Sequence, residues 1–438
     1  MTGPLGEFLT LDLVPIATAS LAAVACAVPG TFLLLRREGL LGDSIAHAVL
    51  PGLVIGLLLS GGLAGGAMFA GAAASALLAV GAIAWLRQGG VEPQAAMGAT
   101  FTAFLAAGIL LLEGSGARAV DLDPDCVISG SLESLFWIPP VDRPLLSLES
   151  LAALPRAFLV LLVVALLVVL AAAALFKELR AATFDPEFMQ VAGRRPALVH
   201  AGLSTATAAA VVASFEAVGT VLVVALLVVP AAAARLLTDR LATQVVLAAA
   251  IGVLGAVGGH LLGAVLPEAL GGESLSSAGS MATLLGAMLA LAALVAPEHG
   301  ILVRLRRRRQ VAVQTAAEDL LGWRWRVEEL ARRARRDRPE PPSLDPGLGR
   351  AAEAHGARRG WWSAGEGALT PLGLEEGRRL VRSHRLWERY LVEDLGLRAD
   401  HVHDTAMVLE HLRSLGIEPP DPAGASLDPQ GRPIPRAS

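Results

Sequence analysis

One apolar run, at about residues 155–176, carries its charged residue at the very start and is long enough to cross a bilayer as a helix. Eight further runs are similar in length and polarity, so the sequence predicts nine membrane-spanning helices. The predicted spans lie at about 11–35, 44–62, 64–86, 94–112, 155–176, 198–214, 217–235, 243–266 and 279–297. The pair at 198–235 could instead be one long or broken helix around Glu216.

Charge is spread unevenly along the chain of 438 residues. Only 17% of the residues are charged and 54% are hydrophobic, whereas a soluble protein carries about 25% charged residues. Residues 1–303 hold 12 Lys or Arg and 20 Asp or Glu, and residues 304–438 hold 24 and 20. We therefore expect an all-α polytopic membrane domain at 1–303, a basic linker at 304–320 and a charged, soluble domain at 321–438.

The basic residues between spans predict the orientation of the chain. They follow the first, third, fifth, seventh and ninth predicted spans, and basic loops face the cytoplasm. These residues are Arg36, Arg37, Arg87, Lys177, Arg180, Arg194, Arg195, Arg235, Arg240 and the RLRRRR stretch at 304–309. The pattern places the N-terminus outside and the C-terminal domain in the cytoplasm. The acidic connection at 113–153 then faces outside, where its negative charge favours cation capture.

The stretch LLGDSIAHAVLPG (40–52) places two ionisable side chains at the mouth of an apolar segment. Asp43 and His47 are four residues apart, so a helix presents them on one face. Ionisable residues in a span are costly and usually functional, and a carboxylate with an imidazole suits Mn²⁺, Fe²⁺ or Zn²⁺. The alternative is an Asp helix cap beside an interfacial His. Glu216 is a second intramembrane acid that could line a path, and His260 could equally hydrogen-bond a neighbouring helix.

No GxxxxGK[ST] phosphate loop occurs anywhere in the chain, so we expect no ATPase activity of its own. Several segments together resemble the permease subunits of ABC importers for manganese, zinc and iron. The matching stretches lie at 33–52, 120–133, 175–193, 212–239 and 294–304. The wording ASFEAVG (213–219) is closer to the manganese and iron branch, so we expect manganese or iron as the substrate, with zinc as the alternative.

This resemblance implies both a path and partners for the chain. Asp43 and His47 would line the permeation path in the plasma membrane of a bacterium. The partners would be a second permease chain, a cytosolic ABC ATPase and an extracytoplasmic metal-binding protein. The apolar residues among the charges of FKELRAATFDPEFMQVAG (176–193) predict an amphipathic surface helix. In this family that loop docks the ATPase, and the residues expected to do so are Phe184, Asp185, Pro186, Glu187 and Gly193.

The C-terminal domain carries a second set of ligand-type residues. GWWSAGEGALTPLG (360–373) has the pattern of the β-wing of a winged-helix domain, and a helical region follows at 375–412. This region and the closing LDPQGRPIP (427–435) resemble the metal-sensing and dimerisation region of the diphtheria toxin repressor family. The resemblance implies one site at His384, Glu388 and His403. It implies another at Met407, Glu410 and His411, with an N-terminal ligand that the sequence does not locate.

Two departures from this second family limit what the tail is expected to do. Met407 stands where the family has Cys or Glu, and a thioether is a weak ligand for a hard ion, so the second site would be weak or favour iron. Residues 331–360 show no convincing recognition helix, although Arg332, Arg333, Arg335 and Arg336 could contact phosphates. The tail is therefore interpreted as a local metal sensor with no permanently bound cofactor, and nucleic acid is a doubtful partner.

Two other classes of function remain open from the sequence. A membrane-tethered, metal-responsive transcription regulator would use the spans only as an anchor. An ion-coupled secondary carrier would need no ATPase, but it would leave the cytosolic FDPEF stretch (184–188) without a role.

Overall fold

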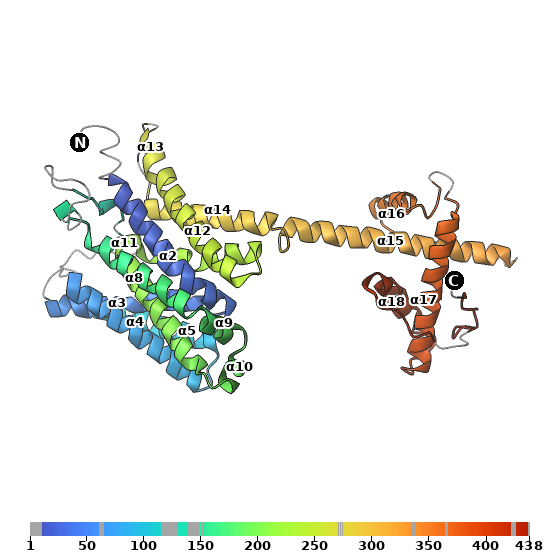
Figure 1. The fold of residues 1–438 in the computed structure, drawn as a ribbon, viewed down its shortest axis with the longest axis horizontal. Coiled ribbons are helices and arrows are strands. Elements are labelled where there is room, and N and C mark those ends of the chain that lie inside the picture. Colours follow the sequence, from blue (N-terminus) through green and yellow to red (C-terminus); the bar gives the residue numbers. More distant parts are fainter. Residues whose placement is uncertain are drawn as a thin grey trace. The chain divides into compact units, whose positions relative to one another are not determined.

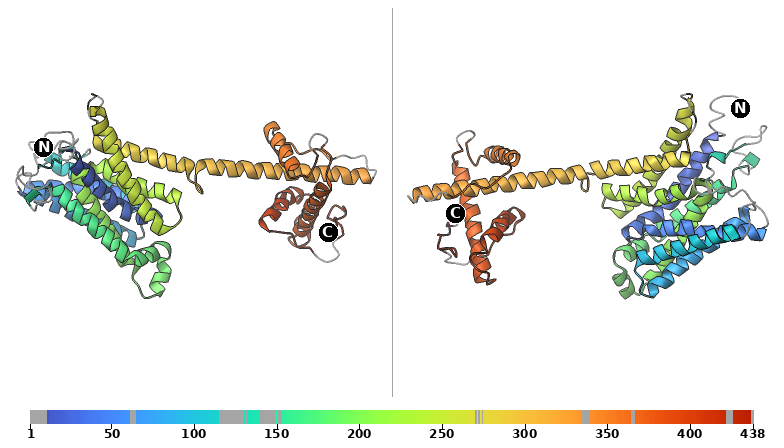
Figure 2. Two further views of the ribbon diagram at one scale, coloured as in Figure 1. Left: turned by 45° about the horizontal axis from the view of Figure 1, so that its top comes forward. Right: turned by 180° about the vertical axis from the view of Figure 1, so that it is seen from behind.

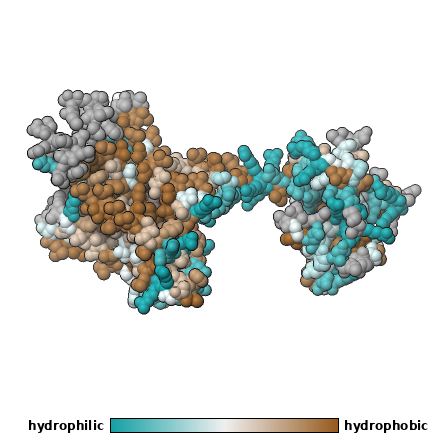
Figure 3. All heavy atoms as spheres, viewed as in Figure 1, coloured by the Kyte–Doolittle hydropathy of each residue, from teal (hydrophilic) through white to brown (hydrophobic). Residues whose placement is uncertain are grey.

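The chain folds into two compact helical units, Met1–Ile301 and Leu302–Ser438. The computed structural model describes residues 11–60, 65–114, 130, 132–138, 149–150, 153–269, 271, 273, 275–333, 339–363, 367–421 and 426–436. The first unit presents a mostly hydrophobic surface, and the second a mostly hydrophilic one (Figure 3). The uneven charge of the sequence therefore corresponds to two physically distinct units.

Within the described residues of the first unit, eight helices are long and apolar enough to cross a membrane. Seven of them are α2 (Leu13–Leu35), α3 (Leu40–Ser60), α4 (Gly65–Gln88), α5 (Pro93–Gly114), α8 (Arg156–Ala174), α12 (Leu241–His260, continued by the π-helix Leu261–Val265) and α14 (Ser277–Val295). The eighth is α11 (Pro196–Leu237). Shorter helices are the 3-10 turn Leu132–Ser134, α9 (Phe176–Phe184), α10 (Pro186–Val191) and α13 (Leu266–Ala269) (Figure 1).

One pair of the nine predicted spans is joined without an intervening loop. The expected spans at 198–214 and 217–235 are joined in the 42-residue helix α11, which is broken at Gly219. The backbone of Gly219 has φ 74° and ψ 169°, a conformation that only glycine adopts without strain. The open alternative of a broken helix is thus the one the structure adopts, with the break three residues after Glu216.

Both halves of α11 pack against the same part of α2. Ser214 Oγ lies 3.6 Å from Cys26 Sγ, and the backbone of Leu227 touches Gly30. Cys26 and Gly30 are about one helical turn apart, roughly 6 Å, whereas a straight helix would separate residues 214 and 227 by about 20 Å. The chain therefore turns back at Gly219, which gives two helical segments each long enough to span a bilayer.

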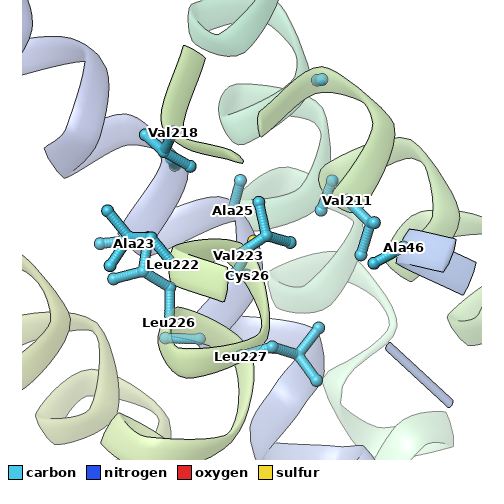
Figure 4. Close-up of a cluster of buried hydrophobic side chains, with 14 of the residues drawn as sticks. Ala23, Ala25, Cys26, Ala46, Val211, Val218, Leu222, Val223, Leu226 and Leu227 are labelled. Atoms are coloured by element: carbon cyan, nitrogen blue, oxygen red, sulfur yellow. The ribbon is translucent and has the colours of Figure 1, made fainter. Parts of the chain in front are cut away.

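The core of the first unit is built around α2, α3 and α11. Figure 4 shows small and branched side chains from these three helices interlocking. Glycine permits the closest contacts: a Cβ on Gly30 would meet the carbonyl oxygen of Leu227, and one on Gly52 would meet that of Gly71. Small residues let helix backbones approach where no hydrophobic effect between helices is available. Single glycines thus fix the packing of α2 on α11 and of α3 on α4.

The peripheral helices leave apolar side chains on the outside. In the 18-residue apolar stretch of α5, α8 or α14, about 22% of the residues are buried, compared with 72% in that of α2. Exposed leucines and valines of α8 include Leu166, Leu167 and Leu170. A helix that is apolar all round and exposed belongs against lipid or another membrane chain.

The acidic connection at 113–153 lies mostly outside the described residues. Within it, Glu133 Oε1 accepts a 2.6 Å hydrogen bond from the backbone N–H of Ser277, the first residue of α14. A carboxylate at this position satisfies a free N–H and complements the helix dipole.

The second unit consists of α15 (Ile301–Arg332, which begins at the last residue of the first unit), α16 (Pro346–Arg358), α17 (Pro371–Glu393), α18 (His403–Leu409) and a 3-10 turn (Glu410–Leu415). The expected basic linker at 304–320 is helical and forms part of α15. α17 crosses the C-terminal half of α15 (Figures 1 and 2). At this crossing Gly377 leaves room for the side chain of Trp325. Thr370 caps α17 by accepting a hydrogen bond from the N–H of Gly373, and Pro371 occupies the first turn.

The β-wing expected at 360–373 remains a prediction. Among the described residues of this stretch, one isolated antiparallel bridge joins Trp362 and Leu369 in place of two strands. Residues 364–366, at the expected turn, lie outside the described residues. α16 precedes this stretch and occupies the interval in which the sequence showed no convincing recognition helix. Of the four arginines proposed for phosphate contact, Arg335 and Arg336 also lie outside the described residues.

Candidate metal sites and docking surface

Asp43 and His47 meet on one face at the start of α3. Asp43 lies in the first turn, and its Oδ1 is 3.5 Å from His47 Nε2. Their side chains are 39% and 34% exposed, although Leu41, Ile45 and Val49 on the opposite face are buried. Phe101 of α5 packs edge-on against the His47 ring at 4.9 Å between centroids. The expected carboxylate–imidazole pair is therefore present and accessible, and α5 orients its imidazole.

The other two intramembrane candidates lie apart from this pair. Glu216 is exposed on α11 just before the break and does not join Asp43 and His47 in any described group of three ligands within 4.8 Å. His260, at the end of α12, is buried, and its Nε2 lies 3.0 Å from Asp12 Oδ1 beside the start of α2. His260 thus pairs with a neighbouring element, the alternative considered for it from sequence. A path role for Glu216 stays a prediction.

The loop expected to dock an ATPase forms two short helices, α9 and α10. Asp185 ends the first and caps the second, since its Oδ1 accepts a 2.9 Å hydrogen bond from the N–H of Phe188, and Pro186 opens α10. Gly193 follows with φ 74°. Phe184 and Phe188 are 63% and 65% exposed. Exposed aromatic side chains held in defined places are suited to anchoring a partner surface.

The first predicted cluster of the C-terminal unit is assembled in the structure. His384 and Glu388 lie one turn apart on α17, and His403 begins α18. Glu388 Oε1 lies 3.1 Å from His384 Nε2 and 2.8 Å from His403 Nδ1, and the two imidazole nitrogens are 3.1 Å apart. His384 and Glu388 are buried, and His403 is half-exposed. Three converging N and O ligands of this kind fit Mn²⁺, Fe²⁺ or Zn²⁺.

Electrostatics keep Glu388 ionised despite its burial. Burial alone would raise its pKa, but hydrogen bonds from His384 and His403 and the charge of Arg432 lower that pKa well below its usual range. Arg432 Nη2 lies 2.6 Å from Glu388 Oε2, the oxygen that faces away from the two histidines. Arg432, from the C-terminal segment, thus fixes the carboxylate with Oε1 directed at both imidazoles.

A second cluster brings α15 against the start of the final 3-10 turn. His411 Nδ1 lies 2.6 Å from Glu318 Oε2, and His411 Nε2 lies 3.2 Å from Asp319 Oδ1. Asp319, Glu410 and His411 place their ligand atoms within 4.8 Å of one another. Burial lowers the pKa of His411, but the hydrogen bonds to Asp319 and Glu318 outweigh it and raise that pKa to about 10. The arrangement combines carboxylates with one imidazole, a set suited to harder divalent ions.

Glu318 and Asp319 are the acidic neighbours of His411 on α15, which the sequence did not locate, and Asp319 belongs to the group of possible ligands. They follow the apolar positions Ala316 and Ala317 in a charged helix, and only packing on α15 brings them to His411. Met407 lies on α18 and is 39% exposed, and its role as a ligand stays a prediction. Glu410 Oε2 is 2.5 Å from His384 Nδ1, so the two nitrogens of His384 face one cluster each.

The family of the chain follows from comparison with known proteins. The ABC 3 transport family matches residues 11–130 and 150–297, most of the first unit. This chain belongs to the ABC 3 transport family. The resemblance inferred from its motifs is thereby confirmed, and its eight apolar helices are those of a multi-pass cell-membrane permease. The secondary-carrier interpretation is accordingly set aside.

The ABC 3 permease has curated relatives over the same region. It is 38% identical over 292 residues to the manganese transport system membrane protein MntD of Bacillus subtilis, which covers 67% of this chain and 94% of that protein. It is 35% identical over 325 residues to the zinc transport system membrane protein TroD of Treponema pallidum, which covers 73% and 84%. PsaBC from Streptococcus pneumoniae shares the fold with a TM-score of 0.53 and 23% identity, over 67% of this chain and 96% of that one.

The tail of the permease matches a second family. The metal binding and dimerisation domain of iron dependent repressors covers residues 370–418. This range contains α17 and α18, and with them the ligand residues expected from the repressor resemblance. The match begins after α16 and after the Trp362–Leu369 bridge. It therefore supports the metal-binding part of the tail and does not extend to the part expected to read DNA.

A third group of ligand-type side chains, which the sequence did not reveal, lies in the permease unit. Asp239, after α11, meets Glu298 and His299, after α14. His299 Nε2 lies 3.2 Å from both Asp239 oxygens, and Arg235 Nη1 lies 2.5 Å from Asp239 Oδ1. The group is exposed to solvent and the arginine already neutralises Asp239, so an ion-pair cluster joining two loops accounts for it.

Proposed function

We propose that this chain is the transmembrane subunit of an ABC importer for a divalent transition metal, with manganese or iron as the favoured substrate and zinc as the alternative. The observation that carries the proposal is the Asp43–His47 pair on α3, in a family whose curated relatives are manganese and zinc transport proteins. Two accessible ligands hold an ion weakly enough to release it, which a conduit requires.

Energy for transport would come from a partner ATPase, since the chain has no phosphate loop. Its docking site would be the surface of α9 and α10, where Phe184 and Phe188 are exposed and where Asp185, Pro186, Glu187 and Gly193 shape the turns. A second permease chain would cover part of the exposed apolar helices, and an extracytoplasmic binding protein would deliver the ion.

The orientation of the chain supports a cytoplasmic tail. The reversal at Gly219 gives α11 two crossings, so the eight helices make nine passes. With the N-terminus outside, Arg36, Arg87, Arg194 and Arg240 all fall on the cytoplasmic side, as the distribution of basic residues requires.

The tail would sense the transported metal. Its two clusters offer imidazole and carboxylate ligands, and His384 faces both. Metal that accumulates in the cytoplasm would occupy them and restrain uptake. In cells preloaded with Mn²⁺, Mn²⁺ uptake by the wild-type permease should fall relative to cells without preloading. Uptake by the Glu388→Gln or His411→Gln variant should not fall. An equal fall in all three proteins would refute this feedback.

Radiolabelled Mn²⁺, Fe²⁺ and Zn²⁺ uptake tests the transport proposal directly. Wild type should take up at least one of these ions, and Asp43→Ala, His47→Ala and Phe184→Ala should each lose that uptake while reaching the membrane at normal levels. Unchanged uptake in the Asp43 and His47 variants would place the path elsewhere. No wild-type uptake of any of the three ions would overturn the proposal.

The repressor-type match to the tail favours one alternative, a membrane-tethered, metal-responsive transcription regulator. That function requires sequence-specific DNA binding. A regulator binds its own promoter DNA in a way that resists added salt. We expect the full-length permease, in detergent with Mn²⁺, to show no such specific binding to its promoter DNA. Specific binding there would favour the regulator.

A further inference from the structure

A buried carboxylate lies at the connection between α2 and α3. Glu38 has a side chain only 4% exposed, in a two-helix connection that is otherwise partly open to solvent. Its Oε1 lies 3.0 Å from Arg87 Nη1, and its Oε2 lies 3.4 Å from Arg36 Nε and 3.6 Å from His200 Nδ1. Ionised carboxylates are almost never buried unless paired, and this one has two guanidinium partners.

The groups around Glu38 come from different helices. Arg87 ends α4, and His200 lies in the first turns of α11, where its Nε2 is 2.8 Å from Arg87 Nη1. Arg36 follows α2 and also donates a 2.9 Å hydrogen bond from Nη1 to the carbonyl oxygen of Ala182 in α9. One buried charge thus holds together the ends of three spanning helices and the surface helix α9.

Glu38 is also joined to the helix that carries the metal pair. Its carbonyl oxygen accepts the N–H of Leu41, in the first turn of α3, and its own N–H donates to the carbonyl oxygen of Leu33 in α2. Asp43 follows five residues later, about 8 Å along a rigid helix. One chain of contacts from Ala182 in α9 to Asp43 thus passes through Arg36, Glu38 and the first turn of α3.

We propose that Glu38 is a positioning residue that transmits displacement of α9 and α10 to the Asp43–His47 end of α3. The inference rests on the proposed transport function. It adds the means by which a movement driven by ATP hydrolysis in a partner is transmitted to the Asp43–His47 pair. A buried ion pair has one low-energy geometry, because separating its members leaves an uncompensated charge in a low-dielectric setting. When α9 moves, Arg36 moves with it, and Glu38 then moves the start of α3.

The test measures metal transported per ATP hydrolysed, in proteoliposomes that hold the permease assembled with its ATPase and supplied with radiolabelled Mn²⁺. Glu38→Gln keeps the size of the side chain and removes its charge. We expect ATP hydrolysis to continue and the metal-to-ATP ratio to fall at least about 5-fold, the lower end of a typical coupling between sites.

Two variants separate coupling from folding. Arg37→Gln changes the neighbouring exposed arginine and should leave the ratio at the wild-type value. Arg36→Lys keeps the charge but loses the planar fork that reaches both Glu38 and Ala182. It should lower the ratio even if Glu38→Gln fails to accumulate.

Failure of this inference is distinct from failure of the transport proposal. Wild-type transport with an unchanged metal-to-ATP ratio in both Glu38→Gln and Arg36→Lys would overturn the role of Glu38 alone. A matching loss of ATP hydrolysis and transport, with the ratio preserved, would show a purely structural role and also overturn it. Wild-type protein that moves no Mn²⁺, Fe²⁺ or Zn²⁺ would overturn both proposals.

Discussion

The Glu388→Gln substitution tests whether the first cluster of the tail is built around a buried charge. Glu388 is fully buried on α17 and receives contacts at 3.1 Å from His384, 2.8 Å from His403 and 2.6 Å from Arg432. Removing one partner of a buried ion pair costs about 3–5 kcal/mol. Arg432 is 41% exposed and can be rehydrated, so we expect a smaller cost, about 2–3 kcal/mol.

Hydrogen exchange of the backbone amides of α17 in the full-length protein measures this cost as a local opening free energy. A cost of about 2–3 kcal/mol corresponds to exchange roughly 30- to 150-fold faster than in wild type. Glu393→Gln is the matched control, since Glu393 lies on the same helix and is 55% exposed in its pair with Arg389. The control should change the opening free energy by less than about 1 kcal/mol.

Added metal extends the same measurement. Mn²⁺ at about 100 times its dissociation constant should protect wild-type α17 by about 2.7 kcal/mol. The Glu388→Gln variant should lose most of that protection, because the carboxylate is one of three converging ligands. Equal exchange in Glu388→Gln and Glu393→Gln, with or without Mn²⁺, would refute the assignment of Glu388 as the charged centre of this cluster.

Three other outcomes follow from the same contacts. The folded-state pKa of His411 is raised to about 10, so the stabilisation from its ion pairs should be complete below about pH 6.5 and be lost as the pH rises through 10. The difference in unfolding free energy between wild type and His411→Gln should therefore shrink over that interval. Tryptophan fluorescence follows the unfolding. A difference that grew with pH would contradict it. Gly219→Ala forces a side chain into φ 74°, at a cost of about 1–3 kcal/mol, and should lower the melting temperature of the purified permease, whereas Gly81→Ala, at a helical position with open space around it, should not. Gly30→Val should prevent accumulation of folded protein in membranes, because its Cβ would collide with the backbone of Leu227; normal folded yield there would mean that α2 and α11 are less tightly packed than described.

The sequence alone determined the fold class, the apolar helices and the division into membrane and charged units. These depend on local properties, since a run of about twenty apolar residues is long enough to span a bilayer, and a run of arginines favours the cytoplasmic side of it. The spacing of Asp43 with His47 and of His384 with Glu388 was also sufficient, because four residues make one helical turn.

Only the tertiary structure decided which distant residues meet. Glu318 and Asp319 reach His411 because α15 packs against the final turn, and Glu38 reaches Arg87 and His200 because three helix ends converge. Neither juxtaposition has a local pattern in the sequence. The break in α11 lies between these cases: the glycine is visible in ASFEAVG, but its positive φ and the reversal follow from packing both halves on α2. The spacing of residues along a helix determines the face on which a side chain lies, and the packing of distant segments determines which residue it contacts.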